Sequence, residues 1–258
     1  MTDSPYLRLI QKTGSTRHPG GLNYSDILLK RCGLGSNSLV LDVGCGAGHT
    51  AAHIAKNYGC RVMGLDCSNE ALARAKEFYF LEPYFELMSF VHGDVLNLAM
   101  NDNSFDVVLC ESVLLFVEDK ARALRELARV VKPGGFLIVN ELCLEQAGGE
   151  DLQAFFARPE IGGFLVHPEV IIDCVSHDFQ LVVLDEKPFD IKEQLMADWQ
   201  QWGNFRGLTM LLEAGYKVAL QPELTRDFFS LLSLLKNMPK NALSQLKHLT
   251  VVAKKTGE

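Results

Sequence analysis

Residues 39–50 read LVLDVGCGAGHT, and this stretch decides the fold of the chain. Its first three residues form an apolar run of the kind that is buried in a parallel sheet. Gly44, Gly46 and Gly48 then predict a sharp turn, because glycine adopts backbone conformations that a Cβ disfavours. From Thr50 the sequence suits a helix. A strand, a glycine turn and a helix form half of a βαβ nucleotide-binding unit.

The glycine spacing and Asp42 distinguish this turn from that of dinucleotide-binding enzymes. The spacing is G-x-G-x-G, whereas dinucleotide enzymes use G-x-G-x-x-G. A carboxylate just before the turn suits a cationic ligand and would repel a pyrophosphate. These features are the first indication that the ligand is S-adenosylmethionine, and they disfavour a NAD-dependent dehydrogenase.

Length and charge limit the classes of protein to consider. A chain of 258 residues can bury one large core, so we expect one α/β domain with insertions. The net charge of -7 disfavours a nucleic-acid partner. No apolar run approaches the ~20 residues that span a bilayer, and the N-terminus does not resemble a signal peptide. We therefore expect a cytoplasmic protein without a membrane span.

The seven cysteines are dispersed and show no C-x-x-C pair or zinc-type spacing. They are interpreted as reduced thiols, and we expect no metal site. Cys45 and Cys67 fall in the glycine turn and after the next strand. Either their side chains act in the site, or they are small apolar residues whose backbone amides matter.

Strands and helices are expected to alternate along most of the chain. Two helical pieces precede residue 35, separated by the turn-forming Thr13–Gly21, and Asn23 or Ser25 is expected to cap the second. The expected strands are Leu39–Val43, Arg61–Leu65, Leu87–Val91, Phe105–Cys110, Phe136–Asn140, Gln180–Leu184 and Leu249–Ala253. This order predicts a mostly parallel sheet with helices on both faces.

The region between the last two strands is too long for an ordinary connection, so a helical cap is predicted there. We expect one domain over 1–258. It would comprise an N-terminal helical segment (1–35), a cofactor-binding core (36–145) and the rest of the sheet with cap insertions (146–258), the cap lying roughly within 187–245.

Five motifs follow one another at predicted strand ends. They are LDVGCGAG, GLDCS, GDV, FDVVLCES and RVVKPGGFLIV. In this order they resemble the class I S-adenosylmethionine-dependent methyltransferases, over about Leu39–Leu142. The resemblance is closest to the small-molecule branch (methyltransferase type 11) that includes the ubiquinone and menaquinone C-methyltransferases. It implies a Rossmann-like seven-stranded sheet whose last strand is antiparallel.

The resemblance also implies roles for individual residues. The backbone of Gly44–Gly48 would pass under the methionine part of the cofactor, with Asp42 near its ammonium and sulfonium groups. Asp66 would accept both ribose hydroxyls in a charge-assisted pair. Asp94 would accept from the adenine amine, with the Val95 amide beside a ring nitrogen.

Some positions keep two interpretations. Asp94 also fits an Asx turn after Gly93, and Glu111 fits either a site role beside the methyl group or a turn. Gly20 and Gly21, with Arg17 or His18 nearby, either close over the cofactor carboxylate or form a hinge. Tyr24 either faces the pocket or packs.

The sequence does not decide whether methyl transfer uses a general base, or which residue would serve as one. A base is needed only if the acceptor keeps its proton until attack, and the candidates are His18, Glu111 and His167. Aromatic residues of the cap would wall the acceptor pocket, or would form core: Phe155, Phe156, Phe164, Trp199, Trp202 and Phe205.

The sequence therefore predicts an enzyme that transfers a methyl group from S-adenosylmethionine to a small-molecule acceptor (EC 2.1.1.-). The alternatives are a methyltransferase acting on protein or tRNA, and a non-catalytic cofactor-binding protein of the same fold. Residues Glu145–Gln245 are expected to select the acceptor, and the assembly is open between a monomer and a homodimer.

Overall fold

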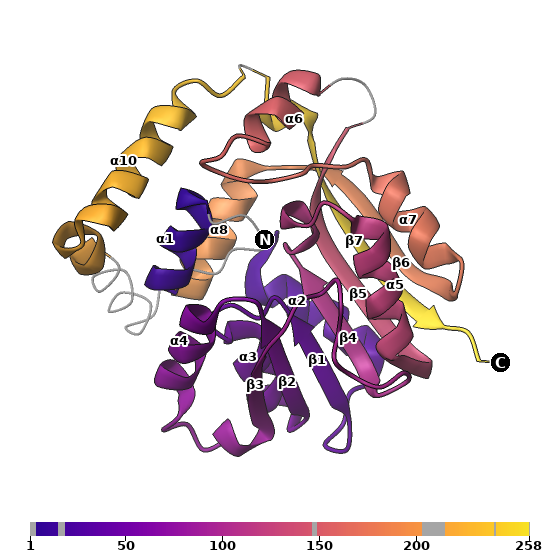
Figure 1. Cartoon of the computed structure of the whole chain (residues 1–258). Coiled ribbons are helices and arrows are strands. Elements are labelled where there is room, and N and C mark those ends of the chain that lie inside the picture. The colour runs from indigo at the N-terminus through magenta and orange to yellow at the C-terminus, as the bar shows by residue number, and fades with distance from the viewer. Residues whose placement is uncertain (1–3, 15–18, 146–148, 203–214, 240, 258) are drawn as a thin grey trace.

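A seven-stranded sheet forms the centre of the molecule, as the computed structural model shows (Figure 1). The structure describes residues 4–14, 19–145, 149–202, 215–239 and 241–257. The strands are β1 (Leu39–Val43), β2 (Arg61–Asp66), β3 (Met88–His92), β4 (Phe105–Glu111), β5 (Val131–Leu144), β6 (Phe179–Pro188) and β7 (Leu246–Lys255). The helices are α1 (Pro5–Thr13), α2 (Gly21–Leu29), α3 (His49–Tyr58), α4 (Asn69–Tyr79), α5 (Lys120–Val130), α6 (Glu150–Phe156), α7 (Pro168–Ser176), α8 (Ile191–Trp202) and α10 (Pro222–Leu235).

The strand order is β3-β2-β1-β4-β5-β7-β6. Strands β1 to β5 pair in parallel, whereas β7 runs antiparallel to both β5 and β6. This topology confirms the predicted Rossmann-like sheet with its antiparallel last strand. It brings the carboxyl ends of β1, β2 and β4 to one edge of the sheet, where open α/β sheets bind ligands.

Helices cover both faces of the sheet because each strand of the centre is apolar on both sides. Leu127 of α5 and Ile171 of α7 are fully buried on one face. Leu29 of α2 and Ile54 of α3 are fully buried on the other. Such two-sided burial is typical of parallel sheets, whose strands are near-continuous apolar runs.

A third apolar cluster lies beyond the carboxyl edge. It joins the short 3-10 helix η3 (Leu114–Phe116) to α6 and to Leu234 of α10, with Tyr6 and Leu7 of α1 packed against it. Helix α1 is held to α10 by the Arg8–Asp227 ion pair at 3.0 Å. In Figure 1, α1, α8 and α10 lie on the left of the molecule and α6 lies at the top, on the side of this edge. No helix in the described part of the chain has the length and apolar character that a bilayer span requires.

Two local predictions were wrong. Helix α2 begins at Gly21, so Asn23 and Ser25 lie inside it and neither caps it. Strand β5 runs from Val131 to Leu144 and so extends past both ends of the predicted Phe136–Asn140. The extension past Asn140 follows from β7, whose residues pair with β5 as far as Leu144. Pairing partners distant in sequence therefore set the strand length.

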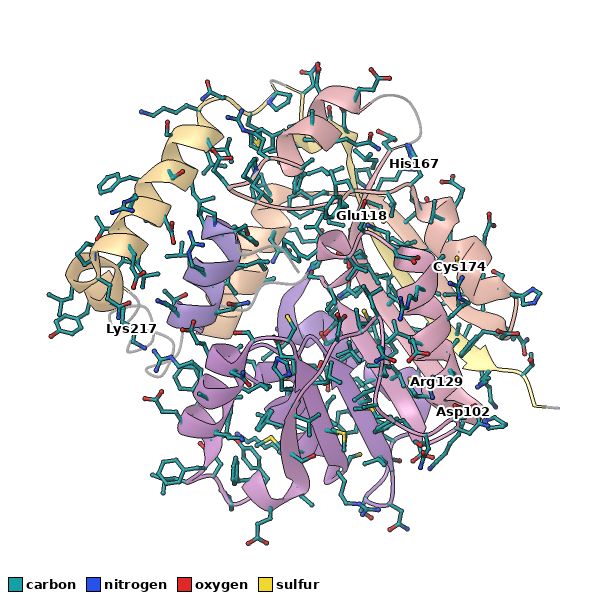
Figure 2. All side chains as sticks on the ribbon, in the orientation of Figure 1. Asp102, Glu118, Arg129, His167, Cys174 and Lys217 are labelled. Atoms are coloured by element: carbon teal, nitrogen blue, oxygen red, sulfur yellow. The ribbon has the colours of Figure 1, made fainter. Side chains whose placement is uncertain are left out.

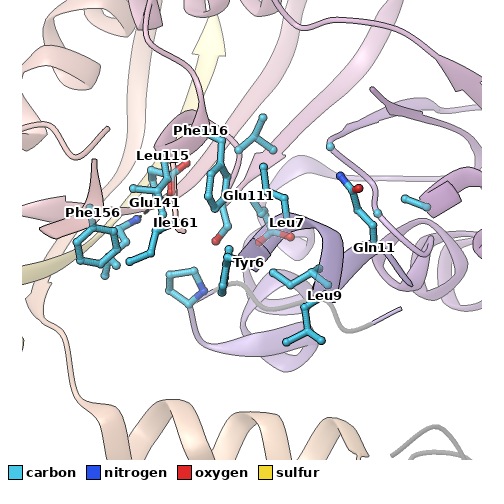
Figure 3. Close-up of a pocket in the computed structure, with 18 of the residues that line it drawn as sticks. Tyr6, Leu7, Leu9, Gln11, Glu111, Leu115, Phe116, Glu141, Phe156 and Ile161 are labelled. Carbon is cyan, nitrogen blue, oxygen red and sulfur yellow. Dashed lines mark hydrogen bonds between the residues drawn. The ribbon is translucent and has the colours of Figure 1, made fainter. Parts of the chain in front are cut away.

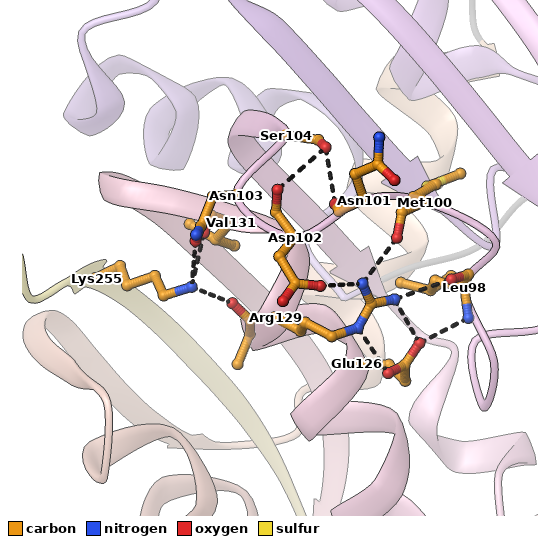
Figure 4. Close-up of polar contacts among 11 residues, drawn as sticks. Leu98, Met100, Asn101, Asp102, Asn103, Ser104, Glu126, Arg129, Val131 and Lys255 are labelled. Atoms are coloured by element: carbon orange, nitrogen blue, oxygen red, sulfur yellow. Dashed lines mark hydrogen bonds and ion pairs between the residues drawn. The ribbon is translucent and has the colours of Figure 1, made fainter.

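The Arg129 guanidinium holds the loop between β3 and β4 on the side of the molecule away from the cap (Figures 2 and 4). It donates to the carbonyls of Leu98 and Met100 at 2.9 and 2.7 Å. It also donates to Glu126 at 2.9 and 2.8 Å and to Asp102 at 2.6 Å. This loop leads into the amino end of β4, so the clamp fixes the edge of the sheet opposite the carboxyl ends.

Replacing Arg129 with methionine is expected to lower the free energy of unfolding by about 2–3 kcal/mol, because two carbonyls and two carboxylates lose their donor. Urea unfolding followed by circular dichroism measures this loss. Lys30→Met removes a pair between Asp26 and a lysine side chain that is 66% exposed, so this control should cost less than about 1 kcal/mol. Equal losses for the two variants would contradict the clamp.

Candidate functional site

The glycine turn is fixed by its neighbours and has no room for a side chain at Gly44 or Gly48. The amides of Gly44 and Cys45 both donate to the carbonyl of Leu65, at 2.7 and 3.0 Å. Gly44 has φ +69°, and a Cβ there would lie 2.3 Å from Cγ2 of Val113. Gly46 and Gly48 also have positive φ. The turn therefore requires glycine, which leaves its backbone open to a ligand.

Asp66, at the end of β2, supports this turn. Its Oδ2 accepts the amide of Gly46 at 2.9 Å, and its Oδ1 accepts the amide of Ser68 at 2.8 Å. Burial raises the pKa of Asp66, and these amides lower it. Each carboxylate oxygen can accept a second hydrogen bond. Asp66 can therefore hold the turn and bind a diol at the same time.

Asp42, at the end of β1, is 4% exposed, and its Oδ2 has no hydrogen-bond partner among the described residues. Burial raises its pKa, and the neighbouring carboxylates of Glu111 and Asp66 raise it further. A buried acceptor without a donor is costly, and nearby negative charges increase the cost. A cation or a hydrogen-bond donor in the adjoining cavity would offset both the missing hydrogen bond and the repulsion between the carboxylates.

Asp94 and Val95 follow β3 and line the same cavity. The Oδ1 of Asp94 accepts the amide of Leu96 at 2.9 Å, which is the predicted Asx turn. The side chain is exposed and lies at the cavity wall, so the turn and a ligand contact are compatible.

Glu111, at the end of β4, is 9% exposed and lines the cavity. The Ser25 hydroxyl lies 2.8 and 3.0 Å from its two oxygens, and the Asn140 amide donates to Oε1 at 2.9 Å. Asn140 also donates to the carbonyl of Pro19 at 3.0 Å. Glu111 and Asn140 therefore tie the segment around Pro19 and α2 to the edge of the sheet, a role that the sequence did not suggest.

The two cysteines of the site are neutral thiols. Cys45 and Cys67 line the cavity beside Asp66. Burial raises the pKa of Cys45, and burial with the Asp66 charge raises the pKa of Cys67 to about 11. Neither is a thiolate nucleophile at neutral pH.

Several predicted site residues lie elsewhere. Gly48 precedes α3 as its N-cap and Gly21 begins α2, and neither is among the residues that line the cavity. His167 does not line it either, and Figure 2 shows it at the upper right, away from α1 and α10. Tyr24 packs against the His248 ring and its hydroxyl donates to Asp185. Arg17 and His18 lie outside the described residues.

The cavity has a volume of about 1120 Å³ and continues from the glycine turn to the helices beyond the sheet (Figure 3). Of the predicted aromatic walls, Phe155 and Phe156 line it, whereas Phe164 does not. The side chains of Trp199, Trp202 and Phe205 are outside the described part. Aromatic lining residues that the sequence did not indicate are Tyr6, Phe116, Phe189 and Phe228.

Glu141 of β5 is a further cavity residue that the sequence analysis missed. It is 1% exposed, and its oxygens accept the amides of Leu114 at 2.7 Å and Leu142 at 3.1 Å. Burial raises its pKa to about 7, despite these amides and the charge of Lys120. A carboxylate inside the apolar strand FLIVNELCL was the signal that could have identified it.

Residues 41–139 match the profile of a family described as "Methyltransferase domain". These residues are a methyltransferase domain. The match covers the glycine turn and the carboxylates at the ends of β1 to β4. The resemblance to the class I S-adenosylmethionine-dependent methyltransferases is thereby confirmed.

The methyltransferase domain is similar to curated proteins and to a solved structure. An uncharacterized protein of Haemophilus influenzae is 35% identical over 138 residues, which are 52% of this chain and 55% of that protein. A 2-methyl-6-phytyl-1,4-hydroquinone methyltransferase of Synechocystis is 42% identical over 102 residues, 40% of this chain and 31% of that protein. The chain thus spans about half of the first relative and a third of the second.

The crystal structure of the cyclase SpnF covers 98% of this chain and 93% of its own, with a TM-score of 0.74 and 19% identity. This likeness concerns the fold. It extends beyond residues 41–139 to the helices around the outer part of the cavity.

The residues present fit S-adenosylmethionine, the cofactor that this family uses. Gly44 and Gly48 have no space for a Cβ, and Asp42, one oxygen of which has no donor among the described residues, lines a cavity whose charged lining is acidic. The sulfonium and ammonium groups of S-adenosylmethionine carry the positive charge that suits this acidic lining, whereas a pyrophosphate would be repelled.

Proposed function

We propose that the chain is a methyltransferase that binds S-adenosylmethionine at the glycine turn and transfers its methyl group to a small-molecule acceptor by in-line displacement. The observation that carries this proposal is the convergence of Asp42, Asp66 and Glu111, from three neighbouring strands, on one cavity beside the turn. The named hydroquinone methyltransferase among its relatives supports a small molecule as acceptor.

Each carboxylate has its own part in this proposal. Asp66 binds the ribose hydroxyls while it keeps the amides of Gly46 and Ser68. Asp42 provides the negative charge near the sulfonium and ammonium groups. Asp94 and the Val95 amide bind the adenine edge. The backbone of the glycine turn lies beneath the methionine part.

S-adenosylmethionine, when bound, supplies a methyl carbon activated by a sulfonium. The chain contributes alignment of the acceptor and exclusion of water, which are worth as much as ~7–11 kcal/mol in favourable cases. Leu115, Phe116 and Phe156 line the cavity, and the Phe116 ring stacks on Tyr6 of α1, so these apolar side chains exclude water from the reacting atoms (Figure 3).

The proposal also includes the organisation of the chain. We propose one domain over 1–258, in which the cap of 187–245 completes the acceptor pocket. The net charge of -7 supports a cytoplasmic enzyme of small molecules without a nucleic-acid partner.

Transfer of a labelled methyl group tests the proposal. S-adenosylmethionine labelled in its methyl group is incubated with the protein and, separately, with a small-molecule extract, a protein extract and tRNA. We expect protein-dependent label in a compound of the small-molecule fraction alone. Label in the protein extract or in tRNA would show that the acceptor is a protein or a tRNA and not a small molecule. Cofactor binding without label in any fraction would favour the non-catalytic alternative.

A further inference from the structure

The outer part of the cavity has an apolar surface that no part of the described chain covers. Phe228, Leu232 and Leu235 line the cavity and are 39%, 41% and 56% exposed. Their spacing of four and three residues places them on one face of α10. Apolar side chains exposed within a concave site are typical of a surface that an apolar ligand covers.

The charges of the cavity have one sign. Its charged lining residues in the described chain are carboxylates: Asp42, Asp66, Asp94, Glu111 and Glu141. No lysine, arginine or histidine of the described residues lines it. An anionic ligand would therefore lose its hydration without gaining an opposite charge from a side chain of the described residues.

The cations of α1 and of α10 with its C-cap, which are Arg8, Lys12, Arg226 and Lys236, do not line the cavity, and Arg226 and Lys236 are exposed. Arg8 of α1 donates to both oxygens of Asp227 on α10, each at 3.0 Å. Lys12 pairs with Glu223 at 3.3 Å. Lys217 does not line the cavity and lies at the outer side of the cap in Figure 2.

The size of the cavity allows a second ligand beside the cofactor. Pockets for one drug-sized ligand commonly have ~300–1,000 Å³. The cavity exceeds this range at about 1120 Å³ and is continuous from the glycine turn to α10. An acceptor can therefore place its reacting atom near the cofactor and its apolar body against α1 and α10.

We infer that the methyl acceptor is an uncharged, mainly apolar molecule bound against α1 and α10, and not a carboxylate or a phosphate ester. This inference rests on the proposed function and narrows its acceptor class. The acidic lining excludes anions, and the apolar face of α10 binds the carbon skeleton.

A matched pair of probes tests the inference. Farnesol and farnesyl diphosphate share one carbon skeleton and differ in charge. Each is titrated calorimetrically into protein saturated with S-adenosylhomocysteine. We expect farnesol to saturate one site with a Kd at least tenfold lower than that of farnesyl diphosphate.

Variants of α10 locate the site. Leu232→Asp should weaken farnesol binding at least tenfold, and Leu232→Lys should reduce the preference for farnesol over the diphosphate. Phe229→Asp is the matched control, because Phe229 is 63% exposed and does not line the cavity, so farnesol binding should change less than twofold. The Kd of S-adenosylhomocysteine should stay within twofold in all three variants.

Farnesyl diphosphate binding as tightly as farnesol would overturn the inference. It would also be overturned if neither probe bound to protein that binds S-adenosylhomocysteine, and in both cases the proposed cofactor site would stand. Failure to bind S-adenosylhomocysteine would instead contradict the proposed function.

Discussion

Asp66→Ala is expected to weaken S-adenosylmethionine binding at least about 100-fold. Two hydrogen bonds from ribose hydroxyls to a charged acceptor contribute roughly 1.5–3 kcal/mol each, and a tenfold change in Kd corresponds to about 1.4 kcal/mol. The substitution also removes the acceptor of the Gly46 amide, which shapes the turn. Calorimetric titration of the variant measures the loss.

Asp119→Ala is the matched control for this experiment. Asp119 also accepts a backbone amide, that of Arg122 at 2.9 Å, but it caps α5 and does not line the cavity. Its loss should cost about 1 kcal/mol of stability and leave the cofactor Kd within twofold. Circular dichroism verifies that both variants are folded. A folded Asp66→Ala protein with the affinity of the parent would contradict the assigned role.

Glu141 is expected to make the protein less stable as the pH rises through neutrality. Its pKa is about 7 in the folded protein against an ordinary value of 4.5. Between pH 4.5 and about pH 7 the unfolded chain releases this proton while the folded protein keeps it. The contribution of Glu141 to stability is therefore complete below pH 4.5 and is lost as the pH rises through about 7. At ~1.36 kcal/mol per pKa unit, the loss from pH 5 to pH 8 is about 2–3 kcal/mol.

Glu141→Gln isolates this contribution because glutamine does not titrate. Urea unfolding of both proteins at pH 5 and pH 8 gives the stability difference between parent and variant at each pH. That difference should move by about 2–3 kcal/mol in favour of the variant at pH 8, whatever its size at pH 5. Other titrating groups cancel in the comparison. A difference independent of pH would show that Glu141 ionises normally.

The sequence predicted that the carboxylates at the strand ends lie together, because their positions depend on local patterns. Each strand end is marked by an apolar run followed by a carboxylate, and parallel strands bring such ends together. Asp42, Asp66 and Asp94 therefore lie around one cavity although up to 52 residues separate them along the chain.

The rest of the site depends on tertiary contacts that no local pattern encodes. Ser25 lies within a helix and meets Glu111 only because α2 packs at the end of β4. Because β5 is apolar on both faces, the alternation of its side chains does not show which face Glu141 lies on. Its hydrogen-bond partner Leu114 is 27 residues away. The outer cavity requires α1 and α10, which the Arg8–Asp227 pair joins across 219 residues.

The most direct test of the central claim is a calorimetric titration of the unaltered protein with S-adenosylmethionine and with its demethylated product. The glycine turn and its carboxylates predict saturable binding of both compounds at a single site. If neither compound bound saturably to the folded protein, the cofactor site and the proposed methyl transfer would both be contradicted.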